Sequence, residues 1–118
     1  MLIRFKRNLE KIAMGLLSFM PEEKDVKKLQ ETIREYEEND GWHLHLWKED
    51  DDVLGAVGVQ ITNDNQLVIK HLTVNPSHRD QWIVSRMIAE IQRIYSDKYD
   101  IVPAESVKAF YEKSLDGL

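Results

Sequence analysis

The sequence predicts an α/β domain with a mainly antiparallel, twisted sheet of about five strands, flanked by four helices. Three observations support this class. A chain of 118 residues can bury one hydrophobic core but is short for two. Apolar residues recur at helical spacing before residue 41 and at a spacing of two after it. Short polar turns join the strand-like segments, and such turns can connect only antiparallel strands. We therefore expect residues 1–118 to form a single domain.

The first third of the chain is expected to supply one short strand and two helices. Leu2–Phe5 alternates as a strand, and Asn8 is a suitable N-cap for a helix that continues to Met20. Pro21 fits the first position of a second helix, which Gly41 ends. Helical spacing gives each helix an apolar face, formed by Leu9, Ile12, Ala13, Leu16, Phe19 and Met20 in the first and by Val26, Leu29, Ile33 and Tyr36 in the second.

Three antiparallel strands are predicted next. Residues 49–52 and 62–65 are polar turns on either side of the strand Val53–Ile61. The strand Leu67–Val74 completes the meander and stops at Asn75 and Pro76. In the first strand, alternation places Trp42, Leu44 and Leu46 on one face and His43, His45 and Trp47 on the other.

The last part of the chain predicts a helix over residues 80–95, a short strand over 99–102 and a final helix over 104–115. Pro103 should cut the strand, because proline has no N–H to donate. The two helices take their apolar faces from Ile83, Met87, Ile91 and Ile94, and from Val107, Phe110 and Tyr111. The complete order is β-α-α-β-β-β-α-β-α.

Composition excludes several classes of protein. Apolar residues make up 42% and charged residues 31% of the chain, which is typical of a folded domain. The formal net charge of −5 disfavours nucleic acid and anionic lipid as partners. The chain has no cysteine, which excludes disulfides, thiolate metal sites and a cysteine nucleophile. This absence agrees with a cytoplasmic protein.

The N-terminal segment has a second interpretation. Lys6, Arg7 and Lys11 precede the apolar run Ile12–Met20, as in a secretory signal peptide. No small-residue cleavage site follows the run, and its apolar residues recur at the spacing of a core helix. It is also much shorter than the ~20 residues that span a membrane. We expect a helix of the domain and no membrane segment.

Metal binding is the first chemistry to consider, because His43 and His45 lie two apart on one strand face and His71 follows two strands later. No cysteine and no fixed carboxylate accompany them, so a packed strand face is the simpler interpretation. The acidic run 49–52 lacks the spaced ligands and the glycine of a calcium loop. We expect no metal.

The segment between the strand 67–74 and the helix 80–95 is more specific. A strand ended by Pro76 is followed by a short polar loop and a helix start. The free N–H groups of a helix start bind phosphate oxygens. Since every β-loop-α unit offers such amides, this signal does not identify a ligand by itself.

The residues of this segment resemble a known family. Leu72-x-Val74-x-Pro76-x-x-Arg79 is similar to the strand-4 motif of the GNAT acetyltransferases, and Tyr111 is similar to the tyrosine of the family's later helix. The order of elements also follows the family over the whole chain. The resemblance implies a GNAT-type fold, acetyl-CoA as donor and a small amine as acceptor. Three segments further resemble the acetyltransferase-like proteins of bacterial riboflavin operons, namely Lys11–Pro21, Leu46–Asp50 and Val74–Arg79.

The resemblance also implies roles for single residues. The backbone of Leu72, Thr73 and Val74 would pair with the pantetheine arm of the cofactor. Tyr111 would give a proton to the departing thiolate, and we expect His71 to be the base that deprotonates the amine. The residues whose amides would hold the pyrophosphate are Arg79, Asp80, Gln81, Trp82, Ile83, Val84 and Ser85.

Two departures from the family pattern stand out. Trp82 and Val84 replace the two motif glycines, and their side chains should crowd the phosphates. The family's last two strands have no counterpart before Leu118, which leaves the strand 99–102 as an exposed edge. A symmetric homodimer that covers this edge is therefore expected.

Two functions remain open at this point. The motif residues favour an N-acetyltransferase, whereas Trp82 and Val84 favour a degenerate GNAT-fold module that binds or regulates without catalysis. Tyr111 also fits a core residue, and His71 an ordinary strand residue.

Overall fold

A single five-stranded sheet organises the computed structural model, which describes residues 1–23 and 25–116, and side chains at all of these but 79–81 and 116. The strands lie side by side in chain order: β1 (Leu2–Arg4), β2 (Trp42–Glu49), β3 (Asp52–Ile61), β4 (Gln66–Val74) and β5 (Asp100–Pro103). Strands β1 to β4 are antiparallel, and β5 is parallel to β4. The predicted class and element order are confirmed.

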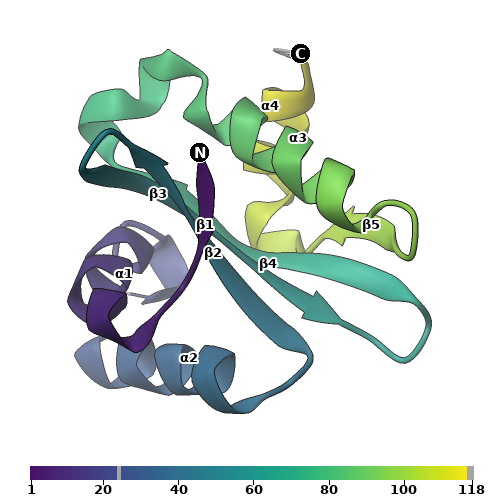
Figure 1. Cartoon of the computed structure of the whole chain (residues 1–118), viewed down its shortest axis with the longest axis horizontal. Helices are drawn as coiled ribbons and strands as arrows, with labels where there is room; N and C mark the ends of the chain where they lie inside the picture. The colour runs from purple at the N-terminus through teal and green to yellow at the C-terminus, as the bar shows by residue number, and fades with distance from the viewer. Residues whose placement is uncertain (24, 117–118) are drawn as a thin grey trace.

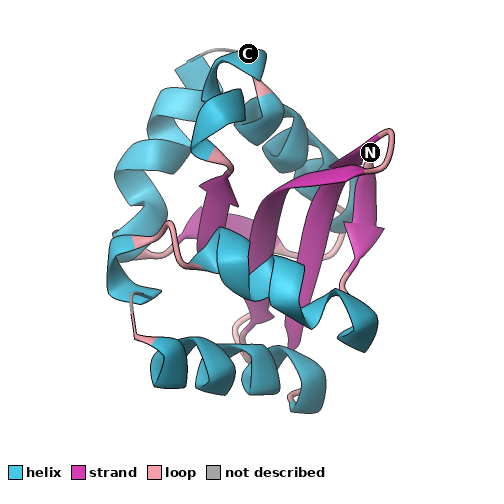
Figure 2. Ribbon diagram, turned by 90° about the vertical axis from the view of Figure 1, so that its left-hand side faces the viewer, coloured by secondary structure: helices cyan, strands magenta, loops and turns pink. Residues whose placement is uncertain are grey.

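Helices cover both faces of the sheet (Figures 1 and 2). In the described part of the chain the α-helices are α1 (Glu10–Leu17), α2 (Val26–Glu38), α3 (Ile83–Tyr95) and α4 (Lys108–Asp116). Helices α1 and α2 pack on one face, and α3 lies on the other with α4 beside it. Within the described residues, no helix is long and apolar enough to cross a lipid bilayer.

Strand alternation divides the side chains between the two helical layers. Trp42 contacts Tyr36 of α2, while His43 and His45 contact Tyr95 of α3, which confirms the faces predicted for β2. In β4, His71 contacts Tyr36 of α2. The core between sheet and helices is apolar, with fully buried residues such as Leu17, Ile33, Leu46, Val57, Ile69, Met87 and Ile91.

The boundaries of the first helices differ from the prediction. A short 3₁₀ turn at Arg7–Leu9 precedes α1, and Asn8 lies inside it rather than at an N-cap. Pro21 begins a second 3₁₀ turn, η2 (Pro21–Glu23), instead of α2. Helix α2 starts after Asp25, whose Oδ1 accepts a hydrogen bond from the Lys27 N–H at 2.9 Å. A capping carboxylate is a stronger start signal than a proline followed by acidic residues.

The later boundaries shift in the same way. The 3₁₀ helix η3 (Pro76–Gln81) occupies the start predicted for a helix over 80–95, so α3 begins only at Ile83. The strand expected over 99–102 covers 100–103, and a 3₁₀ turn, η4 (Glu105–Val107), precedes α4. Four residues assigned to apolar faces are exposed instead: Ile12 in α1, Phe19 in the turn after α1, Val26 at the first position of α2, and Ile94 near the end of α3.

Candidate functional site

The C-terminal half of β4 has a free edge. Pairing with β5 ends at Ile69 and Pro103, and the Ala104 N–H makes the last link, to the Ile69 carbonyl at 2.9 Å. On the other side β4 stays paired with β3 as far as Val74. The Asn75 N–H donates to the Leu54 carbonyl of β3, so by alternation Leu72 and Val74 turn their N–H and C=O groups away from β3. These groups face the gap that β5 leaves.

Two cavities meet at this edge. The smaller, of about 240 Å³, is lined by Leu72 and Thr73 of β4 and by Val107 and Phe110 beyond β5, with Phe19 and Pro21 closing it. The larger, of about 590 Å³, lies beside α2 and β4. Met20 and Ser106 line both cavities. The charged residues of the larger cavity are Glu22, Glu23, Lys28, Glu31, Arg34, Glu35, Glu38 and Lys70.

His71 lies on the wall of the larger cavity and is held from both sides. Its Nε2 is 3.0 Å from Glu23 Oε1, and its Nδ1 is 2.5 Å from the Tyr36 hydroxyl oxygen. A carboxylate can only accept, so Nε2–H donates to Glu23 and the Tyr36 hydroxyl donates to Nδ1. The Thr32 hydroxyl donates to Glu23 Oε2 at 3.1 Å. His71 is 7% exposed and Glu23 3%.

The surroundings of this network determine the protonation states of Glu23 and Tyr36. Burial alone would raise the pKa of Glu23, but hydrogen bonds from His71 and Thr32 and the nearby positive charge of Lys28 bring the pKa below its ordinary value. Glu23 is therefore a carboxylate at neutral pH. Burial, together with the charge of Glu23, raises the pKa of Tyr36 well above its ordinary value, so its hydroxyl keeps its proton.

The start of α3 keeps a set of free amides. The first intrahelical bond runs from the Arg86 N–H to the Trp82 carbonyl at 3.1 Å. The N–H groups of Ile83, Val84 and Ser85 therefore have no partner within the helix. Of the other predicted phosphate residues, Arg79, Asp80 and Gln81 have their backbone in η3, and their side chains lie outside the described residues.

Trp82 occupies an unusual backbone conformation. It is the residue before α3, with φ 61° and ψ 23°, which is the left-handed region that favours glycine. Its side chain is 69% exposed and turns into solvent. Val84 is buried in the core cluster, so the crowding of phosphates expected from its side chain is wrong. The Ser85 hydroxyl donates to the Ser114 carbonyl at 2.9 Å and joins α3 to α4.

Tyr111 is a buried residue of α4. It is 7% exposed and belongs to the core cluster. Its side chain lines neither of the two cavities, and among the described residues nothing hydrogen-bonds its hydroxyl. The structure does not bring Tyr111 and His71 into contact, and the role of proton donor stays a prediction.

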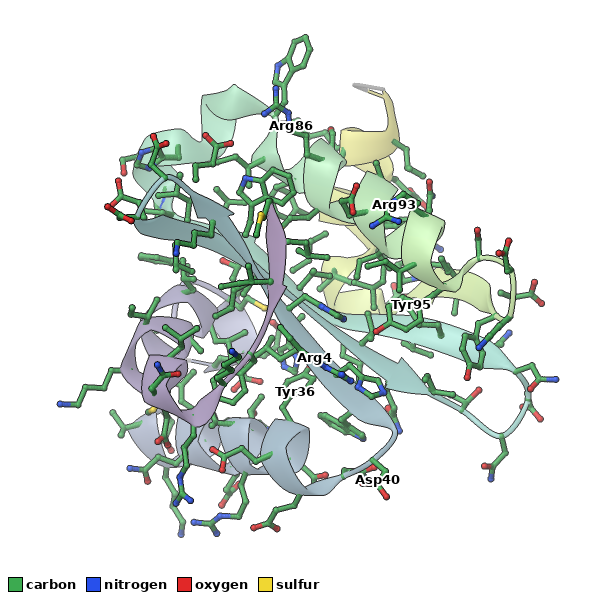
Figure 3. All side chains as sticks on the ribbon, viewed as in Figure 1. Arg4, Tyr36, Asp40, Arg86, Arg93 and Tyr95 are labelled. Carbon is green, nitrogen blue, oxygen red and sulfur yellow. The ribbon has the colours of Figure 1, made fainter. Side chains whose placement is uncertain are left out.

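The other histidines of the sheet lie on the opposite face. His45 Nε2 is 2.8 Å from the Tyr95 hydroxyl, and His43 Nδ1 is 3.2 Å from the Arg4 guanidinium. Figure 3 shows Tyr36 reaching the sheet from α2 and Tyr95 from α3. The sheet therefore separates His71 from His43 and His45. No three His, Asp or Glu side chains in the described part of the chain are grouped as metal ligands.

Two residues of the network were missed from the sequence. Local sequence pattern does not single out Glu23, and it places Tyr36 only on the apolar face of a helix. Each has a neighbour in space that sequence spacing cannot indicate, because His71 lies 48 residues from Glu23 and 35 from Tyr36. The only local signal was a tyrosine on a core-facing stripe, since a buried hydroxyl needs a partner.

A family profile and a curated relative show the family of this chain. The profile of the "Acetyltransferase (GNAT) family" matches residues 9–116. An uncharacterized N-acetyltransferase in the lysA 3' region of Bacillus methanolicus is 51% identical over 113 residues, which are 96% of this chain and 93% of that protein.

Solved structures of the same fold are more distant in sequence. The aminoglycoside N-acetyltransferase AAC(6')-Iy in complex with CoA superimposes with a TM-score of 0.78 at 12% identity, over 99% of this chain and 84% of the other. The same enzyme with a bisubstrate analog gives 0.75 at 15% identity, over 99% and 86%. At these identities the likeness establishes the fold.

Proposed function

The chain belongs to the acetyltransferase (GNAT) family, and from this premise we propose that it transfers an acetyl group from acetyl-CoA to the amino group of a small molecule. The observation that carries the proposal is the free edge of β4. It combines unpaired backbone groups, a narrow cavity beside them and a charged cavity that shares Met20 and Ser106 with the narrow one. In this proposal the donor would bind in the narrow cavity and the acceptor in the charged cavity, beside the residues that the two cavities share.

The donor would bind through backbone groups. An extended pantetheine arm can pair with Leu72 and Val74 as an added strand, because their N–H and C=O groups face the gap beside β5. Thr73 lies between them in the same stretch. The free amides of Ile83, Val84 and Ser85, at the positive end of the α3 dipole, suit the pyrophosphate. Arg79, Asp80, Gln81 and Trp82 complete the predicted set.

The acceptor would bind in the larger cavity. Its volume of about 590 Å³ suits a small molecule. Carboxylates outnumber cationic side chains on its wall by five to three, with Lys28, Arg34 and Lys70 as the cations. This excess of negative charge favours a molecule that carries an ammonium group.

The reaction needs one group that takes a proton and one that gives a proton. Bound acetyl-CoA would supply the thioester, whose carbonyl carbon bonds to the amine nitrogen while the carbon–sulfur bond breaks. We propose that His71, whose side chain lines the acceptor cavity, accepts the proton that the amine nitrogen loses. Tyr111 is proposed to give its hydroxyl proton to the departing thiolate.

Three finer points belong to this proposal. The segments Lys11–Pro21, Leu46–Asp50 and Val74–Arg79 resemble RibT, and we propose a link to riboflavin metabolism on that basis. The absence of cysteine supports a cytoplasmic location. The outer edge of β5 is unpaired in the described sheet, which supports a symmetric homodimer through that edge.

A second candidate is a non-catalytic module with the same fold. Trp82 supports it, because a bulky side chain stands where the family motif has glycine, close to the amides proposed for the pyrophosphate. In this case the chain would bind acetyl-CoA weakly and turn over none.

An acetyl-transfer assay tests the proposal. Purified protein is mixed with acetyl-CoA and a panel of mono-, di- and polyamines, and release of free CoA thiol is followed with product mass. We expect release of the thiol only when the amine is present. The product should be about 42 Da heavier than the amine, because one acetyl group replaces one hydrogen. Acetyl-CoA binding without turnover on any amine would favour the module, and absence of both would contradict the proposal.

A further inference from the structure

The Glu23–His71–Tyr36 chain is a buried polar network whose members come from three separate elements. η2 provides Glu23, β4 provides His71 and α2 provides Tyr36. Each side chain is at least nine-tenths buried. A buried polar network is stable only when every group has a partner, and here both ring nitrogens of His71 and both carboxylate oxygens of Glu23 are bonded.

The backbone of β3 makes room for this network. Gly58 lies opposite His71 in the sheet, at the point where the register between β3 and β4 shifts. A Cβ at this position would overlap the Tyr36 hydroxyl oxygen. Only glycine therefore lets the hydroxyl reach Nδ1 of His71. The tyrosine ring is also fixed by an edge contact with Trp42, at 5.2 Å between centroids.

The two partners of His71 suit both of its charge states. The Glu23 carboxylate accepts from Nε2–H whether the ring is neutral or charged. A hydroxyl can donate to Nδ1 when this nitrogen is bare and accept from it when it carries a proton. Phenylalanine at position 36 would leave Nδ1 without this partner in both states, and glutamine at position 23 would remove the negative charge beside the imidazolium.

Other charges near His71 are less buried. Glu22 precedes Glu23 in η2 and is exposed. Those that α2 and β4 bring to the same cavity are Lys28, Glu31, Arg34, Glu35, Glu38 and Lys70, all exposed or half-buried. Solvent screens them, so Glu23 is the charge that acts on His71 most strongly.

We propose that Glu23 is a positioning residue that holds His71 in one tautomer and one orientation as the proton acceptor of the acetyl transfer, and that Tyr36 holds the same ring and passes the proton to it. The inference rests on the proposed function. As the new carbon–nitrogen bond forms and the carbon–sulfur bond breaks, the amine nitrogen loses one proton to the Tyr36 oxygen, while the Tyr36 hydroxyl gives its own proton to Nδ1 of His71. The thiolate takes its proton from Tyr111. The imidazolium then lies between the Glu23 carboxylate and the Tyr36 oxygen, and both accept from it.

The test compares variants of the whole protein in the acetyl-transfer assay. Tyr36→Phe should lower kcat about 10-fold and Glu23→Gln about 100-fold, with little change in KM for acetyl-CoA, because an orienting partner acts on the proton transfer. Glu23→Gln should also change the pH profile of kcat, because the carboxylate that accepts from the Nε2–H of His71 is lost. Glu23→Asp should recover part of the rate.

Tyr95→Phe is the matched control, because it removes a tyrosine hydroxyl from the other buried histidine of the sheet. It should leave kcat and the pH profile unchanged. In ¹⁵N spectra of the unaltered protein, His71 should be a single tautomer with the hydrogen on Nε2, and Glu23→Gln should abolish this preference.

Three outcomes separate the claims. Unchanged kcat and pH profile in both Tyr36→Phe and Glu23→Gln would overturn the positioning role and leave the proposed function standing. A mixture of His71 tautomers in the unaltered protein would overturn it even if a variant fails to fold. Absence of acetyl-CoA binding and of turnover in the unaltered protein would overturn the proposed function, and the positioning role with it.

Discussion

The two faces of the sheet each bury a histidine that is hydrogen-bonded to a tyrosine, but the neighbours differ. On the face of α1 and α2, His71 is also hydrogen-bonded to the buried Glu23 carboxylate and lines a cavity of about 590 Å³. On the face of α3, His45 and Tyr95 have Arg4 and His43 nearby. Burial and these two groups lower the pKa of His45 to about 4.

A buried histidine that is hydrogen-bonded to a tyrosine can therefore serve in chemistry or in packing, and the groups around the pair decide between the two. The carboxylate beside His71 can accept a hydrogen bond from the imidazolium that a proton acceptor becomes. Burial, and after it the charges of His43 and Arg4, lower the pKa of His45 and keep it uncharged at neutral pH. The face of α1 and α2 thus carries the proposed chemistry, and the face of α3 provides packing and backbone amides.

Gly58→Ala should give the largest effect, because the added Cβ would displace the Tyr36 hydroxyl from His71. We expect a loss of about 3 kcal/mol of unfolding free energy, from overpacking and the broken network. Urea denaturation measures it. Gly15→Ala is the control, since a Cβ there meets nothing within 4 Å in helix α1, and it should gain about 0.5–1 kcal/mol. Equal stability of the two variants would contradict the account of Gly58.

The second prediction concerns acid stability on the α3 face. His45 has a pKa of about 4 in the fold against an ordinary 6.5, so the unfolded chain binds more protons between these values. The part of the unfolding free energy that depends on a neutral His45 is fully present above pH 6.5. It is lost as the pH falls towards 4, and the loss is about 3 kcal/mol in total.

His45→Gln removes this titration. The difference in unfolding free energy between the two proteins should shrink as the pH falls from 6.5 to 4.5, as followed by denaturant titrations. A difference that is independent of pH would show that His45 is not held neutral by its surroundings.

Trp82→Gly should have the smallest effect on folding stability. Glycine relieves the strain of the left-handed backbone in the folded state, and this gain offsets the extra conformational entropy that glycine gives to the unfolded chain. We expect a change within about 0.5 kcal/mol. Affinity for acetyl-CoA should rise about 10-fold, or ~1.4 kcal/mol, since backbone and phosphate can approach more closely. Val84→Ala is a control that alters the core instead. Unchanged affinity in Trp82→Gly would show that Trp82 does not obstruct the amides of α3.

Much of the fold could be predicted from local pattern. Alternation in residues 42–47 fixed which side chains face α2 and which face α3, because one face of each strand must be buried. Helix starts were less predictable: Asp25 and η3 compete with the simpler signals at Pro21 and Asp80, and the energies that separate such starts are about 1 kcal/mol. Exposure of Val26 and Ile94 depends on where α2 and α3 cross the sheet. The local sequence of each helix does not indicate that position.

The site was predictable only where it depends on backbone. Leu72–Val74 and the start of α3 follow from a strand, a proline and a helix in order. The network around His71 depends on Glu23 and Tyr36, which approach it only when α2 packs on the sheet and Gly58 leaves space for a hydroxyl. No spacing rule connects residues from three elements.

The central claim is that β4 and the start of α3 bind acetyl-CoA through backbone amides, and titration of ¹⁵N-labelled protein with acetyl-CoA tests it most directly. We predict saturable shifts of the amide signals of Leu72, Val74 and Ile83–Ser85, with signals of the His45–Tyr95 region on the α3 face unchanged. Saturable binding that shifts other amides while these five stay still would contradict the claim, as would a complete absence of shifts at millimolar acetyl-CoA.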